Sequence, residues 1–189
     1  MKKVAIEPSS LAYRLVNPGS VVLISVGDKN HDNLFPVTWN MPVRKDPGMI
    51  AILSGKRHFS YPFIEKTGEF GVNVPDVSIV DAVYGCGKTS GKDVKDKFSR
   101  FGLTRKESSD IKAPLVNEAV ANLECRVCQV VDLGRSALLI ANILKAQVAT
   151  KHYKNGDWCF DNGLQLLHHL GGDRFCVSDR VVHGKNPAN

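Results

Sequence analysis

Short apolar runs, each closed by glycine, proline or polar residues, most constrain the fold of this chain. The clearest is the β-branched run at residues 20–26, which ends at Gly27 and Asp28 and predicts a buried strand followed by a turn. Further strands are predicted at residues 36–43, 49–53, 71–74, 123–127, 137–149 and 174–182. Many short strands with few helices are typical of a barrel, so we expect a mainly β fold.

Two helical segments are predicted between these strands. Residues 61–66 follow Ser60 and carry Pro62 near the first helical position, which suits a helix N-terminus. Residues 78–84 have apolar side chains at helical spacing, with Ser78 as the expected cap. The 189 residues contain no internal repeat or linker, and we expect one domain over residues 1–189.

Composition limits the classes of function. The formal net charge of +6 permits anionic ligands, but acidic residues interleave with the lysines of residues 92–97, as on a solvated surface of mixed charge. The longest apolar runs, residues 21–24 and 137–141, are too short to span a bilayer, so no membrane association is expected. Five cysteines without a signal peptide predict reduced thiols and a cytoplasmic location.

Three short motifs suggest chemistry that their context does not support. Gly87-Lys88-Thr89 resembles the end of a nucleotide-binding P-loop, but Ala82 replaces the first glycine and the preceding segment is predicted helical. Cys125 and Cys128 would point to opposite faces of a strand, and the adjacent His168-His169 pair would also diverge. We therefore predict no metal site.

Cys86 allows two interpretations. It lies between Gly85 and Gly87 in a segment that continues into several lysines. Nearby cations would lower the pKa of its thiol and make it reactive, whereas a cysteine in a tight turn is commonly inert.

The polar stretch at residues 56–98 carries the functional signal. Hydroxyl groups, glycines and cations gather there in connections between apolar segments. Such a stretch suits a phosphorylated, partly aromatic ligand held against a rigid core. The rest of the sequence supplies no nucleophile, metal cage or acid pair, so any catalysis is expected to use a bound cofactor, and no catalytic residue is assigned.

From about residue 17 to about residue 182, the order of motifs resembles the flavin reductase-like FMN-binding split-barrel family, which includes flavoredoxin. The motifs are Asn-Pro-Gly at 17–19, Thr38-Trp39-Asn40, Thr-Gly-Glu-Phe-Gly-Val-Asn at 67–73, Ser90-Gly91, Lys97-Phe98, Leu-Glu-Cys at 123–125 and His-Leu-Gly-Gly at 169–172. The resemblance implies a six-stranded Greek-key barrel with a few short helices, forming a homodimer with FMN near the subunit interface.

The resemblance also implies a flavin site. The residues expected to line the isoalloxazine are Thr38, Trp39, Asn40 and Asn73; Arg57 and Ser60 are expected at the phosphate, and Ser90, Gly91 and Lys97 at the flavin or phosphate. A guanidinium and a hydroxyl bind a phosphate dianion well. Simpler roles remain open: Trp39 as core, Asn73 as a turn residue, and Arg57 and Lys97 as surface charges.

The resemblance implies a flavin-dependent oxidoreductase, flavoredoxin-like, that carries electrons on bound FMN. Related NAD(P)H-dependent reductases have Gly-Asp-His where this chain has Gly134-Arg135-Ser136, which leaves the donor open between NAD(P)H and a redox protein. One alternative is an NAD(P)H:flavin reductase that supplies reduced flavin to a partner enzyme. A second alternative is a non-catalytic basic module that binds nucleic acid through residues 88–106.

Overall fold

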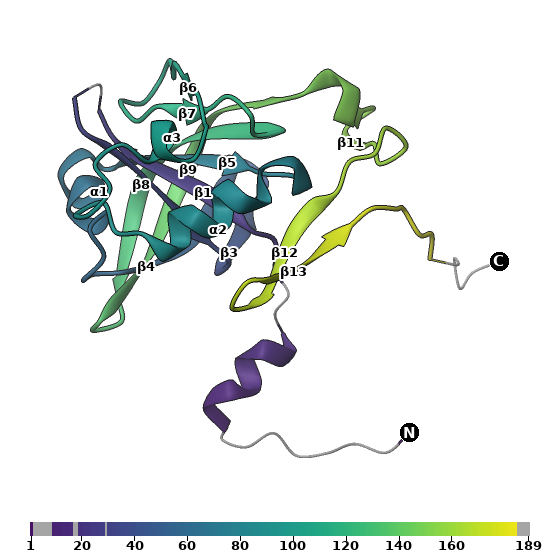
Figure 1. Cartoon of the computed structure of the whole chain (residues 1–189), viewed down its shortest axis with the longest axis horizontal. Helices are drawn as coiled ribbons and strands as arrows, with labels where there is room; N and C mark the ends of the chain where they lie inside the picture. The colour runs from purple at the N-terminus through teal and green to yellow at the C-terminus, as the bar shows by residue number, and fades with distance from the viewer. Residues whose placement is uncertain (2–8, 17–18, 29, 185–189) are drawn as a thin grey trace.

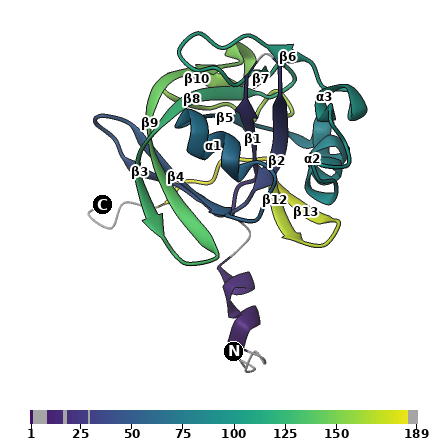
Figure 2. The same cartoon turned by 90° about the vertical axis from the view of Figure 1, so that its left-hand side faces the viewer.

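The computed structural model describes residues 1, 9–16, 19–28 and 30–184. Its main feature is an antiparallel sheet of seven strands that curls into a barrel (Figures 1 and 2). In spatial order the strands are β2 (Asp32–Val37), β1 (Val22–Gly27), β5 (Glu69–Val74), β8 (Ala121–Asp132), β9 (Ser136–Val148), β4 (Met49–Gly55) and β3 (Asn40–Arg44). The mainly β prediction is confirmed, and β3, which pairs only with β4, is the strand beyond the expected six.

The strand predicted at residues 36–43 is two strands. The chain leaves the sheet at Thr38 and Trp39, so residues up to Val37 pair with β1 and those from Asn40 pair with β4. The amide of Leu53 in β4 donates to the carbonyl of Trp39 at 2.9 Å, which draws the two ends of the sheet together. Both edge strands contain a proline, Pro36 in β2 and Pro42 in β3.

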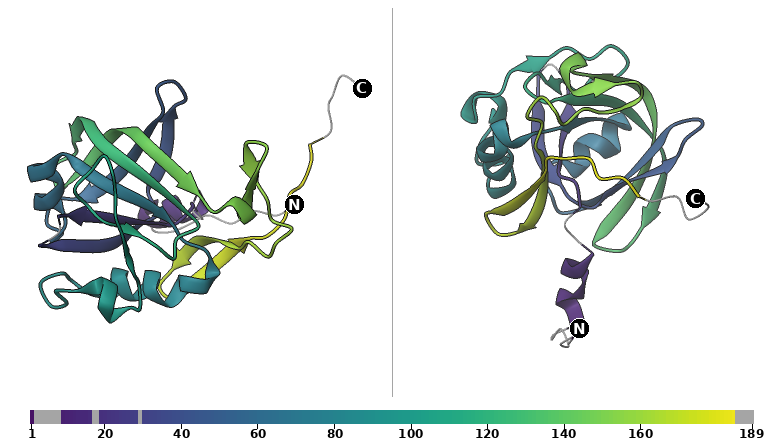
Figure 3. Two further views of the ribbon diagram at one scale, coloured as in Figure 1. Left: turned by 90° about the horizontal axis from the view of Figure 1, so that it is seen from above. Right: turned by 90° about the vertical axis from the view of Figure 1, so that its right-hand side faces the viewer.

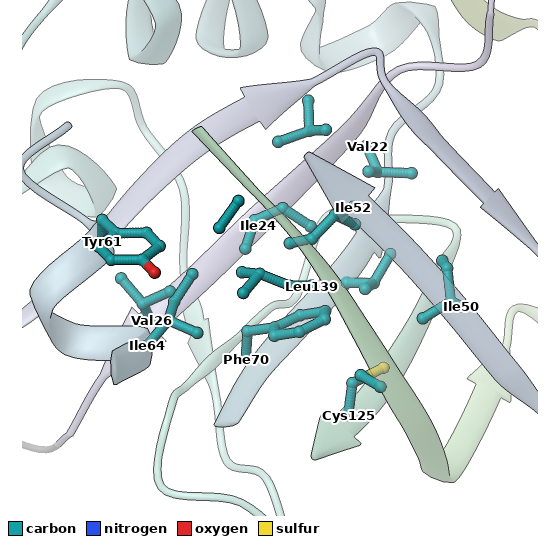
Figure 4. Close-up of a cluster of buried hydrophobic side chains, with 14 residues drawn as sticks. Val22, Ile24, Val26, Ile50, Ile52, Tyr61, Ile64, Phe70, Cys125 and Leu139 are labelled. Carbon is teal, nitrogen blue, oxygen red and sulfur yellow. The ribbon is translucent and has the colours of Figure 1, made fainter. Parts of the chain in front are cut away.

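β1 is buried on both faces, which explains its unbroken apolar sequence. Val22, Ile24 and Val26 point into the barrel, where they pack with residues such as Phe70 and Leu139 (Figure 4). The intervening side chains, including Leu23, pack under the helix that follows β5. A continuous β-branched run is the pattern expected for a strand covered on both sides.

Helix α1 (Tyr61–Thr67) covers one end of the barrel, where Tyr61 and Ile64 join its core (Figure 2). The prediction of a helix at residues 61–66 is confirmed. Gly68 ends the helix with a φ of 67°, and its amide donates to the carbonyl of Ile64 at 2.7 Å. This left-handed conformation favours glycine.

The second predicted helix starts later than residue 78. A single turn, η2 (Val77–Ile79), precedes α2 (Val80–Lys88), which packs against β2 on the outside of the barrel. Ser78 is not the cap: its amide donates to the carboxylate of Asp76 at 3.0 Å. The carboxylate of Asp76 caps the turn η2, which takes the place of a first turn of α-helix at residue 78. The spacing of apolar residues alone does not reveal this side-chain bond.

Short elements complete the chain. The hairpin of β12 and β13 lies beside the start of β1, where the amide of Val21 donates to the carbonyl of Leu167 at 3.0 Å (Figure 3). The predicted strand at 174–182 ends at Ser178, and β12 was not predicted. Among the described residues no helix is long and apolar enough to cross a membrane. The remaining bounds are η1 (Ser9–Leu15), α3 (Lys97–Arg100), β6 (Arg105–Lys106), β7 (Leu115–Val116), η3 (Thr150–His152), β10 (Tyr153–Lys154), β11 (Asp157–Trp158), β12 (Leu166–Gly171) and β13 (Arg174–Ser178).

Candidate cofactor-binding site

A cavity of about 390 Å³ lies between the end of β2, the segment before α1, and the loop after α2. We call it the central cavity. Five of the nine predicted site residues line it: Arg57, Ser60, Ser90, Gly91 and Lys97. The other lining residues are Asn33, Phe35, Pro36, His58, Phe59, Cys86, Gly87, Lys88, Thr89 and Lys92.

The central cavity is positively charged. Arg57, Lys88, Lys92 and Lys97 all line it, and no aspartate or glutamate is among its lining residues. Arg57, Lys88 and Lys92 are exposed, so their side chains can reach a ligand. Lys88 also has a partner within the protein, because its Nζ lies 5.4 Å from the ring centroid of Tyr84. A partly enclosed site with this charge favours an anion such as a phosphate.

Lys97 differs from the other three cations because it is 2% exposed. Its Nζ donates to the carbonyls of Leu34 and Cys86, both at 2.8 Å. Burial lowers the pKa of Lys97. The open alternative of a surface charge is therefore wrong for Lys97, which fixes the floor of the cavity to β2 and α2.

Ser60 presents an unused proton donor. Its side chain is 2% exposed, and its hydroxyl oxygen accepts a 2.7 Å bond from Nδ2 of Asn33. Within the described part of the chain, the hydroxyl proton has no protein acceptor. It is therefore available to an oxygen of a ligand in the central cavity.

Cys86 lies in α2, and 1% of it is exposed. Burial raises the pKa of its thiol to about 11, although Lys97 acts in the opposite direction. The hypothesis of a reactive thiol in a cation-rich loop is wrong, and the inert interpretation stands.

Thr38 and Trp39 lie beside the central cavity. They line a smaller cavity of about 150 Å³ that shares Phe35, Pro36 and His58 with it. Trp39 is 50% exposed, and Tyr13 of η1 meets its ring edge-on at a centroid distance of 5.7 Å. The alternative of Trp39 as a core residue is therefore wrong.

The two predicted amides have different partners. Asn40 donates to the carbonyls of Ser20 at 2.8 Å and Val37 at 3.2 Å, so it fixes the turn into β3. Asn73 is fully buried and donates to the carbonyl of Leu23 and the hydroxyl of Ser25. Neither side chain lines the central cavity.

An apolar cavity of about 330 Å³ adjoins the central cavity, and Pro36 and Thr38 are among its lining residues. It lies between α2 and the β12–β13 hairpin, and Tyr84 and Phe175 form part of its wall. Lys88 lines both this cavity and the central cavity, so the two are neighbours.

The sequence motifs set aside earlier have simple structural explanations. Gly87 and Lys88 are the last residues of α2, which continues beyond the predicted end at residue 84, so they lie in a helix and not in a phosphate-binding loop after a strand. Cys125 is fully buried and Cys128 is exposed, so they lie on opposite faces. Among the described residues, no cluster of three or more His, Cys, Asp or Glu side chains is placed to hold a metal ion.

Sequence reasoning missed several lining residues, of which Asn33 is the most informative. It follows the polar residues of the turn at 27–30, and asparagine is common in turns, so the sequence offered no reason to place it in a strand. The usable signal was its position one residue before the buried Leu34, which places it on the opposite face of β2.

Known proteins resemble this chain in sequence and in fold. The uncharacterized protein YddH of Escherichia coli (strain K12) is 32% identical over 176 residues, covering 90% of this chain and 93% of YddH. The FMN-binding domain of a flavin reductases-like enzyme from Shewanella baltica OS155 is 25% identical, with a TM-score of 0.80 over 96% of this chain and 97% of that chain.

Flavoredoxin of Desulfovibrio vulgaris (Miyazaki F) has the same fold. Its TM-score is 0.83 at 21% identity, over 100% of this chain and 99% of that chain. The flavin reductase like domain family matches residues 13–174, a range that includes all nine predicted site residues. The chain therefore belongs to the flavin reductase like domain family.

Proposed function

We propose that this protein binds FMN and acts as a flavin-dependent oxidoreductase. The observation that carries the proposal is the central cavity: four cations and no carboxylate line it, and the hydroxyl proton of Ser60 is unused. A phosphate dianion matches these donors, because charged hydrogen bonds are the strongest that a protein offers. Family membership supports a flavin-related redox role.

In this proposal the phosphate binds near Arg57 and Ser60, and Ser90, Gly91 and Lys92 contact its oxygens or the adjoining ribityl chain. Thr38 and Trp39, with Phe35 and Pro36, offer the flat wall that an isoalloxazine needs. We propose structural roles for Asn40 and Asn73, because their amides are bonded within the protein. Bound FMN would supply the electron-transfer chemistry.

We further propose that residues 1–189 form one flavin-binding domain that works as a homodimer in the cytoplasm. FMN would stay bound and carry electrons, as in a flavoredoxin. The electron donor is NAD(P)H or a redox protein. Arg135 is exposed on the β8–β9 turn and does not line the central or the apolar cavity, so nothing in its position favours one donor.

The apolar cavity favours a second candidate, an NAD(P)H:flavin reductase. It adjoins the central cavity at Pro36 and Lys88 and would place a small flat ring beside the flavin. Steady NAD(P)H consumption with excess free FMN would identify this activity. A carrier with tightly bound FMN would instead react once per chain.

The structure gives less support to nucleic-acid binding than the number of cations at residues 88–106 suggests. Of the cations at residues 88–106, Lys97 is buried and Arg105 is bonded to Asp32 and Asp96. Fewer positive charges are therefore free to bind a phosphate backbone.

Titration of the purified protein with FMN and with riboflavin tests the proposal, followed by flavin fluorescence. We expect one FMN per chain. Arg57→Ala should weaken FMN binding about tenfold or more, since a hydrogen bond to a charged group contributes about 1.5–3 kcal/mol, while riboflavin binding changes little.

Arg100→Ala is the matched control, because Arg100 is exposed and lies outside the central cavity. It should bind both flavins as the unmodified protein does. Absence of saturable FMN binding would refute the proposed function. Equal losses of FMN and riboflavin affinity in Arg57→Ala would refute the phosphate assignment.

A further inference from the structure

A cavity of about 180 Å³ lies between η1 and the β12–β13 hairpin, where η1 projects from the barrel (Figure 1). We call it the outer cavity. Thr38 and His169 line both the outer cavity and the apolar cavity, so the two are contiguous. The outer cavity therefore extends the apolar cavity toward η1. The remaining lining residues of the outer cavity are Tyr13, Arg14, Trp39, Leu170 and Gly171.

The apolar cavity is suited to a flat ring. Val21 and Val83 form part of its wall and are only 2% and 1% exposed, and Tyr84 and Phe175 add aromatic surface. Its volume of about 330 Å³ lies in the range of small-molecule sites. Aromatic side chains favour stacked or edge contacts with an aromatic ligand. Size and lining together therefore favour a small aromatic molecule.

Arg14 gives the outer cavity a positive charge. Its Nε donates to the hydroxyl of Tyr13 at 3.4 Å, and its two Nη atoms lie against the backbone of Gly171. Arg14 is exposed, and among the described residues no carboxylate pairs with it or lines either cavity. The free edge of a guanidinium matches a carboxylate, which it can bind through two parallel hydrogen bonds.

Lys88 is the other cation of this region, and its position differs from that of Arg14. It lines the apolar cavity on the side of the central cavity, where it is among the cations of the proposed phosphate site. Its Nζ also lies near the ring of Tyr84. Arg14 does not line the central cavity. The charge of Arg14 is therefore available to a different anion.

We propose that the apolar and outer cavities together bind a small aromatic carboxylate. The ring would lie against Tyr84 and Phe175, and the carboxylate would accept hydrogen bonds from Arg14. Thr38 lines both of these cavities and also the small cavity beside Trp39, so this ligand would lie next to the wall proposed for the isoalloxazine. The site is separate from the phosphate site and is formed without a flavin.

Calorimetric titration with benzoate and with benzamide tests this inference, on the purified protein both free of FMN and loaded with FMN. Benzamide has the same ring and nearly the same shape without the charge. We expect benzoate to bind about tenfold more tightly than benzamide in both forms of the protein, since a hydrogen bond to a charged group is stronger than one between neutral groups.

Two variants separate the carboxylate contact from the ring contact. Arg14→Gln removes the charge and should weaken benzoate binding about fivefold or more while leaving benzamide binding unchanged. Phe175→Ala removes part of the ring wall and should weaken both probes to a similar extent. Tyr84→Leu gives the same comparison from the side of α2. Far-UV circular dichroism and thermal melting verify that the variants fold.

Arg180→Gln is the matched charge control, because Arg180 is exposed and lines neither cavity. It should leave both affinities unchanged. Equal losses of benzoate affinity in Arg14→Gln and Arg180→Gln would mean that general charge attracts benzoate, and would overturn the inference. Unchanged benzoate binding in both Phe175→Ala and Tyr84→Leu would also overturn it, because the ring would then lie elsewhere.

Equal affinities of the unmodified protein for benzoate and benzamide would overturn the carboxylate assignment and favour a neutral ring, such as the nicotinamide of the second candidate function. The proposed function fails separately. Absence of FMN binding would refute that function, whereas benzoate binding to the FMN-free protein would still support the site at Arg14.

Discussion

Lys97 shows how one side chain can reverse its role between sequence and structure. It lies in a run of alternating charges that is typical of a solvated surface, yet it is 2% exposed. The cause is local: Phe98 is fully buried, and α3 holds Lys97 against the carbonyls of Leu34 and Cys86. Lys97 therefore supports the cavity before any ligand arrives.

Lys97→Met should destabilise the protein even without flavin. Removing the amine leaves two carbonyls without this donor, at a cost of about 1–3 kcal/mol in the free energy of unfolding. Lys95→Met, in the same run but exposed, should change it by less than about 0.5 kcal/mol. Urea unfolding of both variants measures the difference. Equal stabilities would contradict the supporting role of Lys97.

At this scale the sequence predicted residue types better than their contacts. Hydroxyls, glycines and cations between strands indicated the central cavity, and Arg57, Ser60, Ser90, Gly91 and Lys97 line it. Local sequence does not reveal which polar groups are already bonded. Asn40 is an example, because its partners Ser20 and Val37 depend on how the chain turns after β2.

Among the elements, α3 depends on a single carboxylate. Asp96 accepts a hydrogen bond from the amide of Ser99 at 3.0 Å and pairs with Arg105 at 2.8 Å. The bond from Arg105, followed by the amide bonds, lowers the pKa of Asp96 below 3.8. Because the folded-state pKa is the lower one, this stabilisation is present above pH 3.8 and is lost as the pH falls through the folded-state pKa.

Asp96→Asn tests this linkage. Asparagine can still cap α3 but carries no charge, so we expect a loss of about 0.5–1 kcal/mol near neutral pH, a modest value because the pair is half exposed. The loss should shrink in acid as Asp96 of the unmodified protein becomes protonated. Denaturant titrations near pH 7 and near pH 3 would measure it, and a loss independent of pH would exclude the ionic contribution.

The elements also show the limits of pattern reasoning. Period and composition predicted most strands of the main sheet and the helices α1 and α2, but not α3, β12 or the ends of the predicted elements. The strand predicted at 36–43 is interrupted because its second half pairs with β4 instead of β1. Pairing partners are fixed by contacts distant in sequence, which no local window contains.

For the whole molecule, Asn73 holds the barrel together. Its amide nitrogen donates to Leu23 and Ser25 of β1, and its oxygen accepts from the amide of Val116 and the side chain of Asn122. One side chain in β5 thus joins β1, β7 and β8. The resemblance in sequence predicts a cofactor contact at this position; in the structure the amide nitrogen and oxygen of Asn73 both bond within the protein.

Asn73→Ala should lower the free energy of unfolding by about 2–4 kcal/mol, because several buried partners lose their bonds. Asn117→Ala, at an exposed position, is the control and should change stability little. Thermal and urea unfolding give the stabilities, and FMN titration gives the affinity. Loss of FMN affinity at unchanged stability would instead identify Asn73 as a flavin contact.

The barrel as a whole could be predicted from the sequence, because a chain of short strands with few helices has few ways to form a core. The order of strands, with β5 between β1 and β8, was not predicted from the strand pattern itself. Nor was the β12–β13 hairpin, whose histidines satisfy Nε2 locally, His168 with Ser178 and His169 with the carbonyl of Gly172.

The prolines in the edge strands have a consequence for self-association. Pro36 in β2 and Pro42 in β3 cannot donate a backbone hydrogen bond, and they interrupt the row of donors that an incoming strand would need. Strand addition at these edges is therefore disfavoured, which protects the sheet from runaway polymerisation. Any stable contact between copies of this chain must bury side chains from other surfaces.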